Sequence, residues 1–223
     1  MLPATMDQTG RFYLGHIGKV PVYAAVDAIF LVIFVFVFVG AGMSMDQILL
    51  IFIALLMTIL FHELGHALTA LAVGQMGVSI TITGLGGLCS YVGDRHPKKE
   101  LAISFAGPAT NLMLAWVSWL FLSNGVPTDV TLRFLLEQFW WWNLVLGILN
   151  ALPIFPLDGG QMALSLGRMV SREYAAKRFA LYLSFVTAPL ALGAYLVVFP
   201  GNLPIFLILM ILFLLFTAYR ELR

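Results

Sequence analysis

Long apolar segments constrain this chain more than any other feature of its sequence. A helix needs about 20 apolar residues to cross the hydrocarbon core of a bilayer. Six segments come close to this length or exceed it: Val22–Val39, Ile48–Val73, Leu101–Leu122, Leu132–Leu152, Phe179–Phe199 and Leu203–Ala218. Of the 223 residues, 61% are hydrophobic and only 10% are charged, which is too few charges to cover a soluble domain. The sequence therefore predicts an all-α integral membrane protein with about six transmembrane helices.

Two interruptions modify this helical plan. Pro153 and Pro156 follow the fourth segment, and apolar spacing resumes at Gly159–Val170, so we expect a broken fourth helix because proline removes a backbone donor. Between segments two and three, Val78–Thr83 alternates apolar and polar residues with the period of a strand. Glycines follow, and Leu88–Val92 is a candidate second strand. This pattern predicts a short β-hairpin near the cytoplasmic side.

The positive charges predict the orientation. Basic residues gather in cytoplasmic loops. With six spans, eleven of the twelve basic residues fall on one side, and these are Arg11, Lys19, Arg95, Lys98, Lys99, Arg168, Arg172, Lys177, Arg178, Arg220 and Arg223. The opposite side has only Arg133. We therefore expect both chain termini in the cytoplasm.

Charge and cysteine content exclude other classes of protein. The net charge of +1 is unlike that of a domain that neutralises nucleic-acid phosphates, so we expect no nucleic-acid partner. The single cysteine, Cys89, excludes an internal disulfide and a cysteine-based zinc knuckle.

The second apolar segment contains a polar cluster. Ionisable residues in a membrane helix are costly, about 2.5–3.5 kcal/mol each on insertion scales, so His62, Glu63 and His66 require a reason. Two histidines four residues apart lie on one helix face and can reach one metal ion. H-E-x-x-H is the arrangement of zinc hydrolases, with the glutamate as general base. We expect metal ligands at His62 and His66 and a catalytic base at Glu63.

A catalytic zinc needs a third protein ligand and an open position for water. Asp158, within Asn150–Gly160, is the best candidate because it lies at membrane depth in an irregular segment. His66 is about 10 Å and Asp158 about 15 Å from the cytoplasmic ends of their segments, at 1.5 Å per residue. Similar depth in two helices of the same direction is consistent with one shared ion.

Three motifs together resemble those of the site-2 proteases, a family of intramembrane zinc metalloproteases of the M50 type. They are H-E-x-x-H at His62–His66, G-P-x-x-N at Gly107–Asn111, and N-x-x-P-x-x-x-x-D-G at Asn150–Gly159. The resemblance covers about residues 48–170, which it implies are the catalytic core of a single membrane-embedded domain over residues 1–223. It implies a minimal form without the PDZ or CBS domains of some relatives, in a prokaryotic cell membrane.

The resemblance also implies the chemistry and the partners. One zinc ion per chain would be held by His62, His66 and Asp158, and Glu63 would move protons. The substrate would be a transmembrane segment of another protein, cut within or near the bilayer after unwinding. Val78–Thr83 is expected to pair with the unwound stretch by strand addition. The sequence does not determine the oligomeric state.

Several roles stay open. Asn111 and Asn150 are candidates for binding substrate or stabilising the transition state. Asn111 is equally suited to a hydrogen bond between helices, and Asn150 to satisfying backbone groups that the prolines leave free. For the whole chain, the alternatives are a six-helix transporter, since broken helices and intramembrane charges also mark transporters, and a non-catalytic metal-binding membrane protein.

Overall fold

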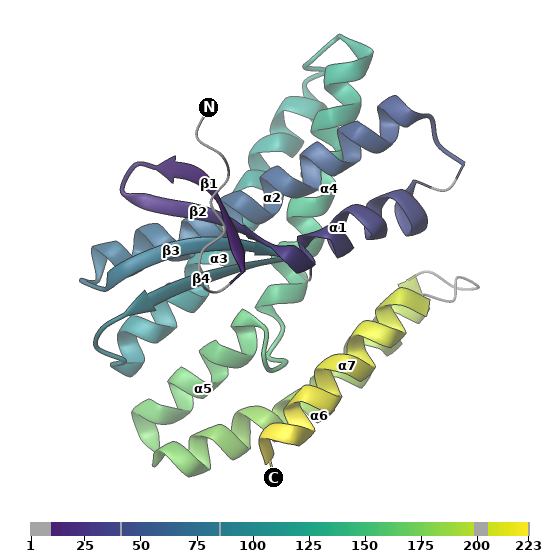
Figure 1. The fold of residues 1–223 in the computed structure, drawn as a ribbon. Coiled ribbons are helices and arrows are strands. Elements are labelled where there is room, and N and C mark those ends of the chain that lie inside the picture. Colours follow the sequence, from purple (N-terminus) through teal and green to yellow (C-terminus); the bar gives the residue numbers. More distant parts are fainter. Residues whose placement is uncertain (1–9, 41, 85, 199–204, 223) are drawn as a thin grey trace. The chain divides into compact units, whose positions relative to one another are not determined.

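The computed structural model describes residues 10–40, 42–84, 86–198 and 205–222. The elements follow the order β1 (Arg11–Ile17), β2 (Val20–Ala25), η1 (Val26–Ala28), α1 (Ile29–Ile33), η2 (Phe34–Val39), α2 (Met45–Ala72), β3 (Met76–Thr83), β4 (Gly86–Val92), α3 (Pro97–Ser123), α4 (Val130–Ala151), α5 (Asp158–Val170), α6 (Glu173–Val198) and α7 (Ile205–Leu222) (Figure 1). Parts of the sequence predictions, namely Phe199, Leu203 and both chain ends, lie outside the described residues.

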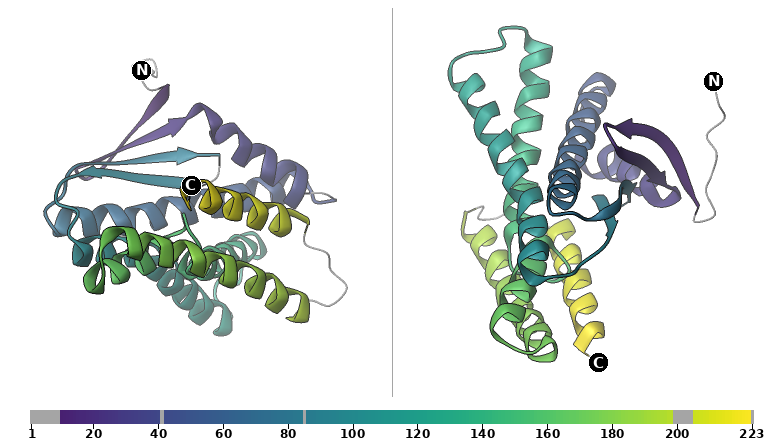
Figure 2. Two further views of the ribbon diagram at one scale, coloured as in Figure 1. Left: turned by 90° about the horizontal axis from the view of Figure 1, so that it is seen from below. Right: turned by 90° about the vertical axis from the view of Figure 1, so that its left-hand side faces the viewer.

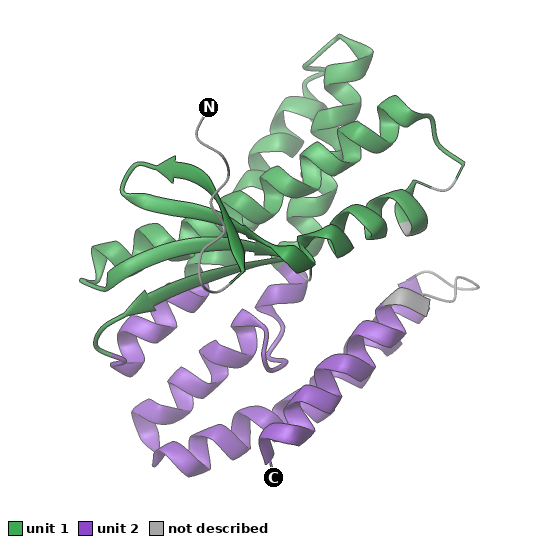
Figure 3. Cartoon of the chain, in the orientation of Figure 1, with its two compact units in different colours: residues 1–94, 106–147 green, residues 95–105, 148–223 purple. Residues whose placement is uncertain are grey.

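The chain separates into two compact units (Figure 3). The first unit comprises residues 1–94 and 106–147, and the second comprises residues 95–105 and 148–223. The first therefore contains the strands, α1 and α2, and the second contains α5, α6 and α7.

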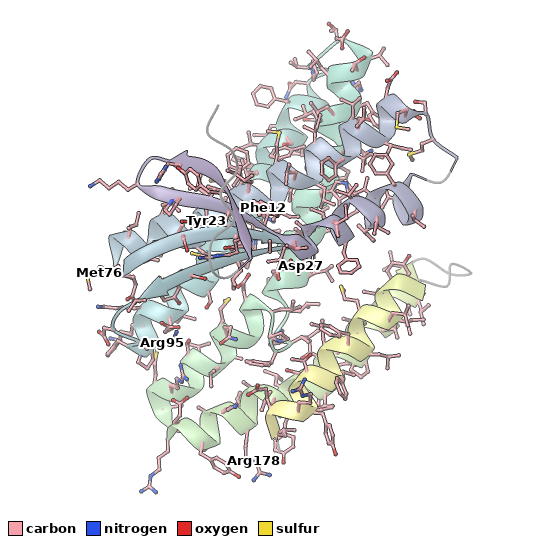
Figure 4. The ribbon with its side chains drawn as sticks, viewed as in Figure 1. Phe12, Tyr23, Asp27, Met76, Arg95 and Arg178 are labelled. Atoms are coloured by element: carbon pink, nitrogen blue, oxygen red, sulfur yellow. The ribbon has the colours of Figure 1, made fainter. Side chains whose placement is uncertain are left out.

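A four-stranded sheet characterises the first unit. Its order is β1-β2-β3-β4, with β1 and β2 antiparallel, β2 and β3 parallel, and β3 and β4 antiparallel. Both β3 and β4 contact α2, and the views agree that the sheet lies along this helix (Figures 1 and 2). Val20, Ile80 and Ile82 are buried, while Phe12 and Tyr23 are partly exposed on β1 and β2 (Figure 4). The alternating apolar residues of β3, Val78, Ile80 and Ile82, are thus buried.

The all-α prediction is wrong for the N-terminal region. Residues 22–25, the start of the first expected span, belong to β2, and only Val26–Val39 is helical. A short continuous apolar run cannot be assigned to helix or strand from periodicity alone, and valine is well suited to both a membrane helix and a strand. The hairpin of β3 and β4 is formed, but as half of a larger sheet.

Local sequence explains where α2 begins and ends. Ser44 and Gln47 form a capping box: the Ser44 amide donates to Gln47 Oε1 at 3.1 Å, and the Gln47 amide donates to Ser44 Oγ at 3.4 Å. After Val73, Gly74 adopts a φ of +86°, a left-handed conformation that favours glycine at a helix end. These signals fix the register of the 28-residue helix that carries the polar cluster.

The second unit is a packed set of helices. The start of α6 lies against α5 so closely that a Cβ on Gly167 would be 3.0 Å from the Ala176 Cβ. Ile154, from the segment between α4 and α5, is 2% exposed and packs with Ala188 of α6 and Ile211 of α7. The broken segment is therefore part of the apolar core of this unit.

Three helices of the described residues are long and apolar enough to cross a membrane: α2, α3 and α6. The apolar helix at Val26–Val37 is shorter. The segment expected as the fourth span forms helix α4, which ends at Ala151 and is not among these three, and the break is followed by α5 from Asp158.

Candidate metal centre

The polar cluster of α2 is buried. His62, Glu63 and His66 are 6%, 5% and 6% exposed and lie in a mostly apolar helix. Burying ionisable groups in an apolar environment is costly unless they are paired or bind a metal. All three predicted residues are thus buried, and their burial requires a functional explanation.

The two imidazoles converge. Their spacing of four residues puts His62 and His66 one helical turn apart on one face, and the Nε2 atoms are 3.1 Å apart. The ring centroids are 4.7 Å apart, and the rings are nearly perpendicular at 85°. Neutral histidines bind one zinc ion when a ring nitrogen of each is directed to the same point, as here.

At Gly107 the backbone of α3 lies close to the imidazoles of His62 and His66. A Cβ built there would lie 2.3 Å from His66 Nε2 and 2.8 Å from His62 Cε1. On α2, a Cβ on Gly65 would lie 2.4 Å from Thr110 Oγ1 and 2.8 Å from the Ala106 carbonyl oxygen. Small residues allow helix backbones in membranes to approach closely. The G-P-x-x-N motif therefore has a steric role beside the histidines, in addition to any role of its asparagine.

Strand β4 approaches the cluster at Glu63. A Cβ on Gly87 would lie 2.3 Å from Glu63 Cγ and 2.4 Å from Oε1, so a larger residue at this position would require the Glu63 side chain to move. Cys89 follows on the same strand, and burial, with a smaller contribution from the Glu63 charge, raises the pKa of its thiol from 9.0 to about 12. Cys89 is therefore protonated at neutral pH and unsuited to nucleophilic chemistry.

Asn111 lies one turn after Gly107 on α3. The side chain has no exposed surface, and neither its amide nitrogen nor its oxygen has a hydrogen-bond partner among the described residues. A buried amide without partners is costly. Asn111 is thus available to bind a polar group.

Sequence reasoning missed a second buried asparagine. Asn143 of α4 is 0% exposed and donates to Thr58 Oγ1 at 2.9 Å and to the Phe139 carbonyl oxygen at 2.7 Å. Thr58 precedes His62 by one turn on the same face of α2, and its hydroxyl donates to the Ala54 carbonyl oxygen at 2.8 Å. The sequence contained a signal for this contact, because an isolated asparagine in an apolar segment commonly forms a hydrogen bond to a neighbouring membrane helix.

The remaining predicted residues belong to the second unit. Asp158 is the first residue of α5 and is half-buried, and Asn150 lies half-buried in the last turn of α4. Close backbone contacts precede Asp158: a Cβ on Gly159 would lie 2.2 Å from the Leu152 carbonyl oxygen, and one on Gly160 would lie 2.6 Å from the Phe155 nitrogen. The glycines after Asp158 therefore allow α5 to begin against the broken segment.

One expectation about β3 is wrong. Val78–Thr83 was expected to pair with an unwound substrate, but β3 is hydrogen-bonded to β2 on one side and to β4 on the other. Sequence periodicity identifies a strand but not its neighbours. The outer strands of the described sheet are β1 and β4.

Comparisons with known proteins show what the chain is similar to. A family model described as Peptidase family M50 matches residues 50–140 and 122–194. Rip3 of Mycobacterium tuberculosis is 37% identical over 114 residues, 49% of this chain and 29% of the relative. A zinc metalloprotease of Methanocaldococcus jannaschii is 32% identical over 180 residues, 78% of this chain and 49% of the relative. The chain thus spans half or less of the length of these relatives.

The fold comparison covers nearly the whole chain. The solved structure of the site-2 protease from Methanocaldococcus jannaschii matches 96% of this chain and 95% of that chain, with a TM-score of 0.67 and 26% identity. Together with the three apolar helices, this identifies an integral membrane protein. Because the family match extends over more than half of its residues and includes the H-E-x-x-H turn, the chain belongs to peptidase family M50.

Proposed function

We propose that the protein is an intramembrane zinc metalloprotease that hydrolyses peptide bonds within or near transmembrane segments of other membrane proteins. The observation that carries this proposal is the buried His62–Glu63–His66 turn in a helix long and apolar enough to cross a membrane. The family match and a relative named as a zinc metalloprotease support it.

His62, His66 and Asp158 are the proposed ligands of one zinc ion per chain. Each offers one ligand atom, a ring nitrogen from each histidine and a carboxylate oxygen from Asp158. This donor set fits a catalytic zinc, which takes three protein ligands and keeps one position open. The converging Nε2 atoms and the bare backbone of Gly107 fit the same ion. With ligands from both units, residues 1–223 act as one catalytic domain whose core is about residues 48–170.

Glu63 moves the protons of the reaction. Zinc, when bound, lowers the pKa of a coordinated water toward about 7 and polarises the scissile carbonyl. Glu63 follows one ligand directly on the helix, so its carboxylate can accept a proton from the attacking water and deliver it to the leaving amine. The contact with Gly87 limits where that carboxylate can lie.

Asn111 is the proposed donor to the developing oxyanion. Its amide is fully buried and has no partner among the described residues, and a pre-positioned donor in a water-poor site stabilises negative charge strongly. Asn150 is the second candidate, at the end of the helix that precedes the Asp158 segment.

The outer edge of β4 in the described sheet is the proposed place for the unwound substrate. A helix hides its peptide bonds, so the target must be extended before attack. The outer edge of β4 can add a strand, and this strand begins in contact with Glu63. An extended peptide bound there would pass the catalytic carboxylate.

For the membrane arrangement we propose six spans with both termini in the cytoplasm of a prokaryotic cell. Arg95 precedes α3 and Arg178 lies near the start of α6 (Figure 4), both at the ends that the positive-inside rule places in the cytoplasm.

The test uses the purified full chain and a panel of single-span peptides, with and without a zinc chelator. We expect cleavage that the chelator abolishes, one zinc per chain, and fragments cut within or near the span. Glu63→Gln should keep zinc and lose cleavage, whereas Glu137→Gln, an exposed change on α4, should alter neither. Zinc binding without cleavage, or solute flux through proteoliposomes, would contradict the proposal.

A further inference from the structure

Ser184 of α6 holds the segment that leads to Asp158. Its side chain is 0% exposed, and its Oγ accepts a hydrogen bond from the Phe155 amide at 2.8 Å. The same hydroxyl donates to the Ala180 carbonyl oxygen at 2.9 Å. Both the donor and an acceptor of the hydroxyl are therefore used, and its orientation is fixed.

Two backbone hydrogen bonds after Phe155 extend the ordering of this segment to Asp158. The Leu157 amide donates to the Ile154 carbonyl oxygen at 2.8 Å, which closes the turn around Phe155. The Gln161 amide donates to the Leu157 carbonyl oxygen at 3.1 Å and starts α5. Asp158 follows Leu157 directly, so its backbone lies inside the first hydrogen-bonded turn of α5, next to the turn around Phe155.

Packing fixes the same segment to α6. Ile154 packs against Ala188, which follows Ser184 by one turn on α6. Ala188 is 0% exposed and Ile154 is 2% exposed. On the opposite side, the Cβ that Gly160 lacks would meet Phe155 N at 2.6 Å. The segment is thus held between α6 and the first turn of α5.

We propose that Ser184 is a positioning residue for the metal ligand Asp158, so that α6 sets the direction of the third zinc ligand. This inference rests on the proposed function, because it requires that Asp158 bind zinc. Groups that orient metal ligands typically change metal affinity about 10- to 100-fold when they are removed. Ser184 acts through the backbone of Phe155 and does not touch the metal.

A serine that bonds only to the carbonyl four residues earlier is common in membrane helices and has no such role. The second bond, from the Phe155 amide, distinguishes Ser184. Thr217 of α7 provides the matched control, because its hydroxyl donates to the Phe213 carbonyl oxygen at 3.0 Å in the same way.

The experiment measures two quantities on the full chain in detergent micelles. The first is hydrogen exchange of the Phe155 and Leu157 amides in zinc-free protein, and the second is zinc retention against a chelator. We expect Ser184→Ala to accelerate exchange at Phe155 at least about tenfold and to weaken zinc binding about 10-fold. Ser184→Thr, which keeps the hydroxyl, should resemble the unmodified protein in both, as should Thr217→Ala.

The outcomes separate this inference from the proposed function. If Asp158→Asn weakens zinc binding while Ser184→Ala does not, Asp158 is a ligand and the positioning role of Ser184 is wrong. If Asp158→Asn retains zinc fully, the ligand assignment fails and this inference fails with it. If Ser184→Ala does not fold, Ser184→Cys replaces it with the same expectation, because a thiol keeps the volume but is a weak acceptor.

Discussion

A methyl group added at Gly107 should expel zinc without unfolding the protein. The Cβ of Gly107→Ala would lie 2.3 Å from His66 Nε2, whereas ordinary van der Waals contact begins at 3.4 Å. His66 Nε2 must therefore move by about 1.1 Å, and His62 Cε1, at 2.8 Å, must move by about 0.6 Å. Zinc–nitrogen bonds tolerate deviations of only about 0.2 Å.

The clash falls on the far ends of two side chains rather than on backbone. In zinc-free protein the imidazoles can rotate away, and alanine is a better helix former than glycine by up to about 1 kcal/mol. We therefore expect the zinc-free thermal unfolding midpoint to stay the same or rise. Zinc affinity should fall by about 10- to 100-fold or more, as for other changes that misorient ligands, and cleavage should be lost with it.

The assay compares zinc retention in a chelator series with thermal unfolding of zinc-free protein in micelles. Gly193→Ala on α6 is the matched control, because its Cβ would meet nothing within 4 Å; it should leave zinc affinity and cleavage unchanged. Should Gly107→Ala retain zinc as well as Gly193→Ala does, the histidines are not held as ligands beside this backbone, and the reasoning is refuted.

Three further predictions concern the surroundings of the histidines. Gly87→Ala should displace the Glu63 carboxylate and lower the cleavage rate about 100-fold with zinc retained; wild-type turnover in a peptide assay would contradict the contact. Because the pKa of Cys89 is raised from 9.0 to about 12, alkylation followed by mass spectrometry should still accelerate between pH 9 and 11, and a plateau above pH 9 would show an ordinary thiol. Thr58→Val should cost about 0.6–1.7 kcal/mol of stability by removing the acceptor for Asn143, and unchanged unfolding would argue against that bond.

The convergence of the two histidines was predictable because helical periodicity and motif spacing are local. His62 and His66 fall on one face from their separation alone, and the structure brings their Nε2 atoms within 3.1 Å. The break before Asp158 followed from Pro153 and Pro156. The assignment of Asp158 as third ligand stays a prediction.

What the sequence could not supply depends on contacts between distant segments. Residues 22–25, the end of β2, have the composition of a membrane helix, and only pairing with β1 and β3 makes them part of a strand. The neighbours of β3 could not be read from its alternation either. The bond between Asn143 and Thr58 joins residues 85 positions apart, so no local pattern identifies it.

Two glycines from different elements, Gly107 of α3 and Gly87 of β4, lie in close contact with side chains of the H-E-x-x-H turn. One glycine leaves the imidazoles room to converge, and the other lets strand β4 contact the side chain of Glu63, the proposed catalytic base. Both contacts are within the first unit, which carries the two proposed histidine ligands and the proposed proton carrier, whereas the proposed ligand Asp158 belongs to the second unit. If the ligand set is correct, zinc binding requires both units. Zinc should therefore slow proteolytic cutting of the segment between Ala151 and Asp158 more than it slows cutting in β1.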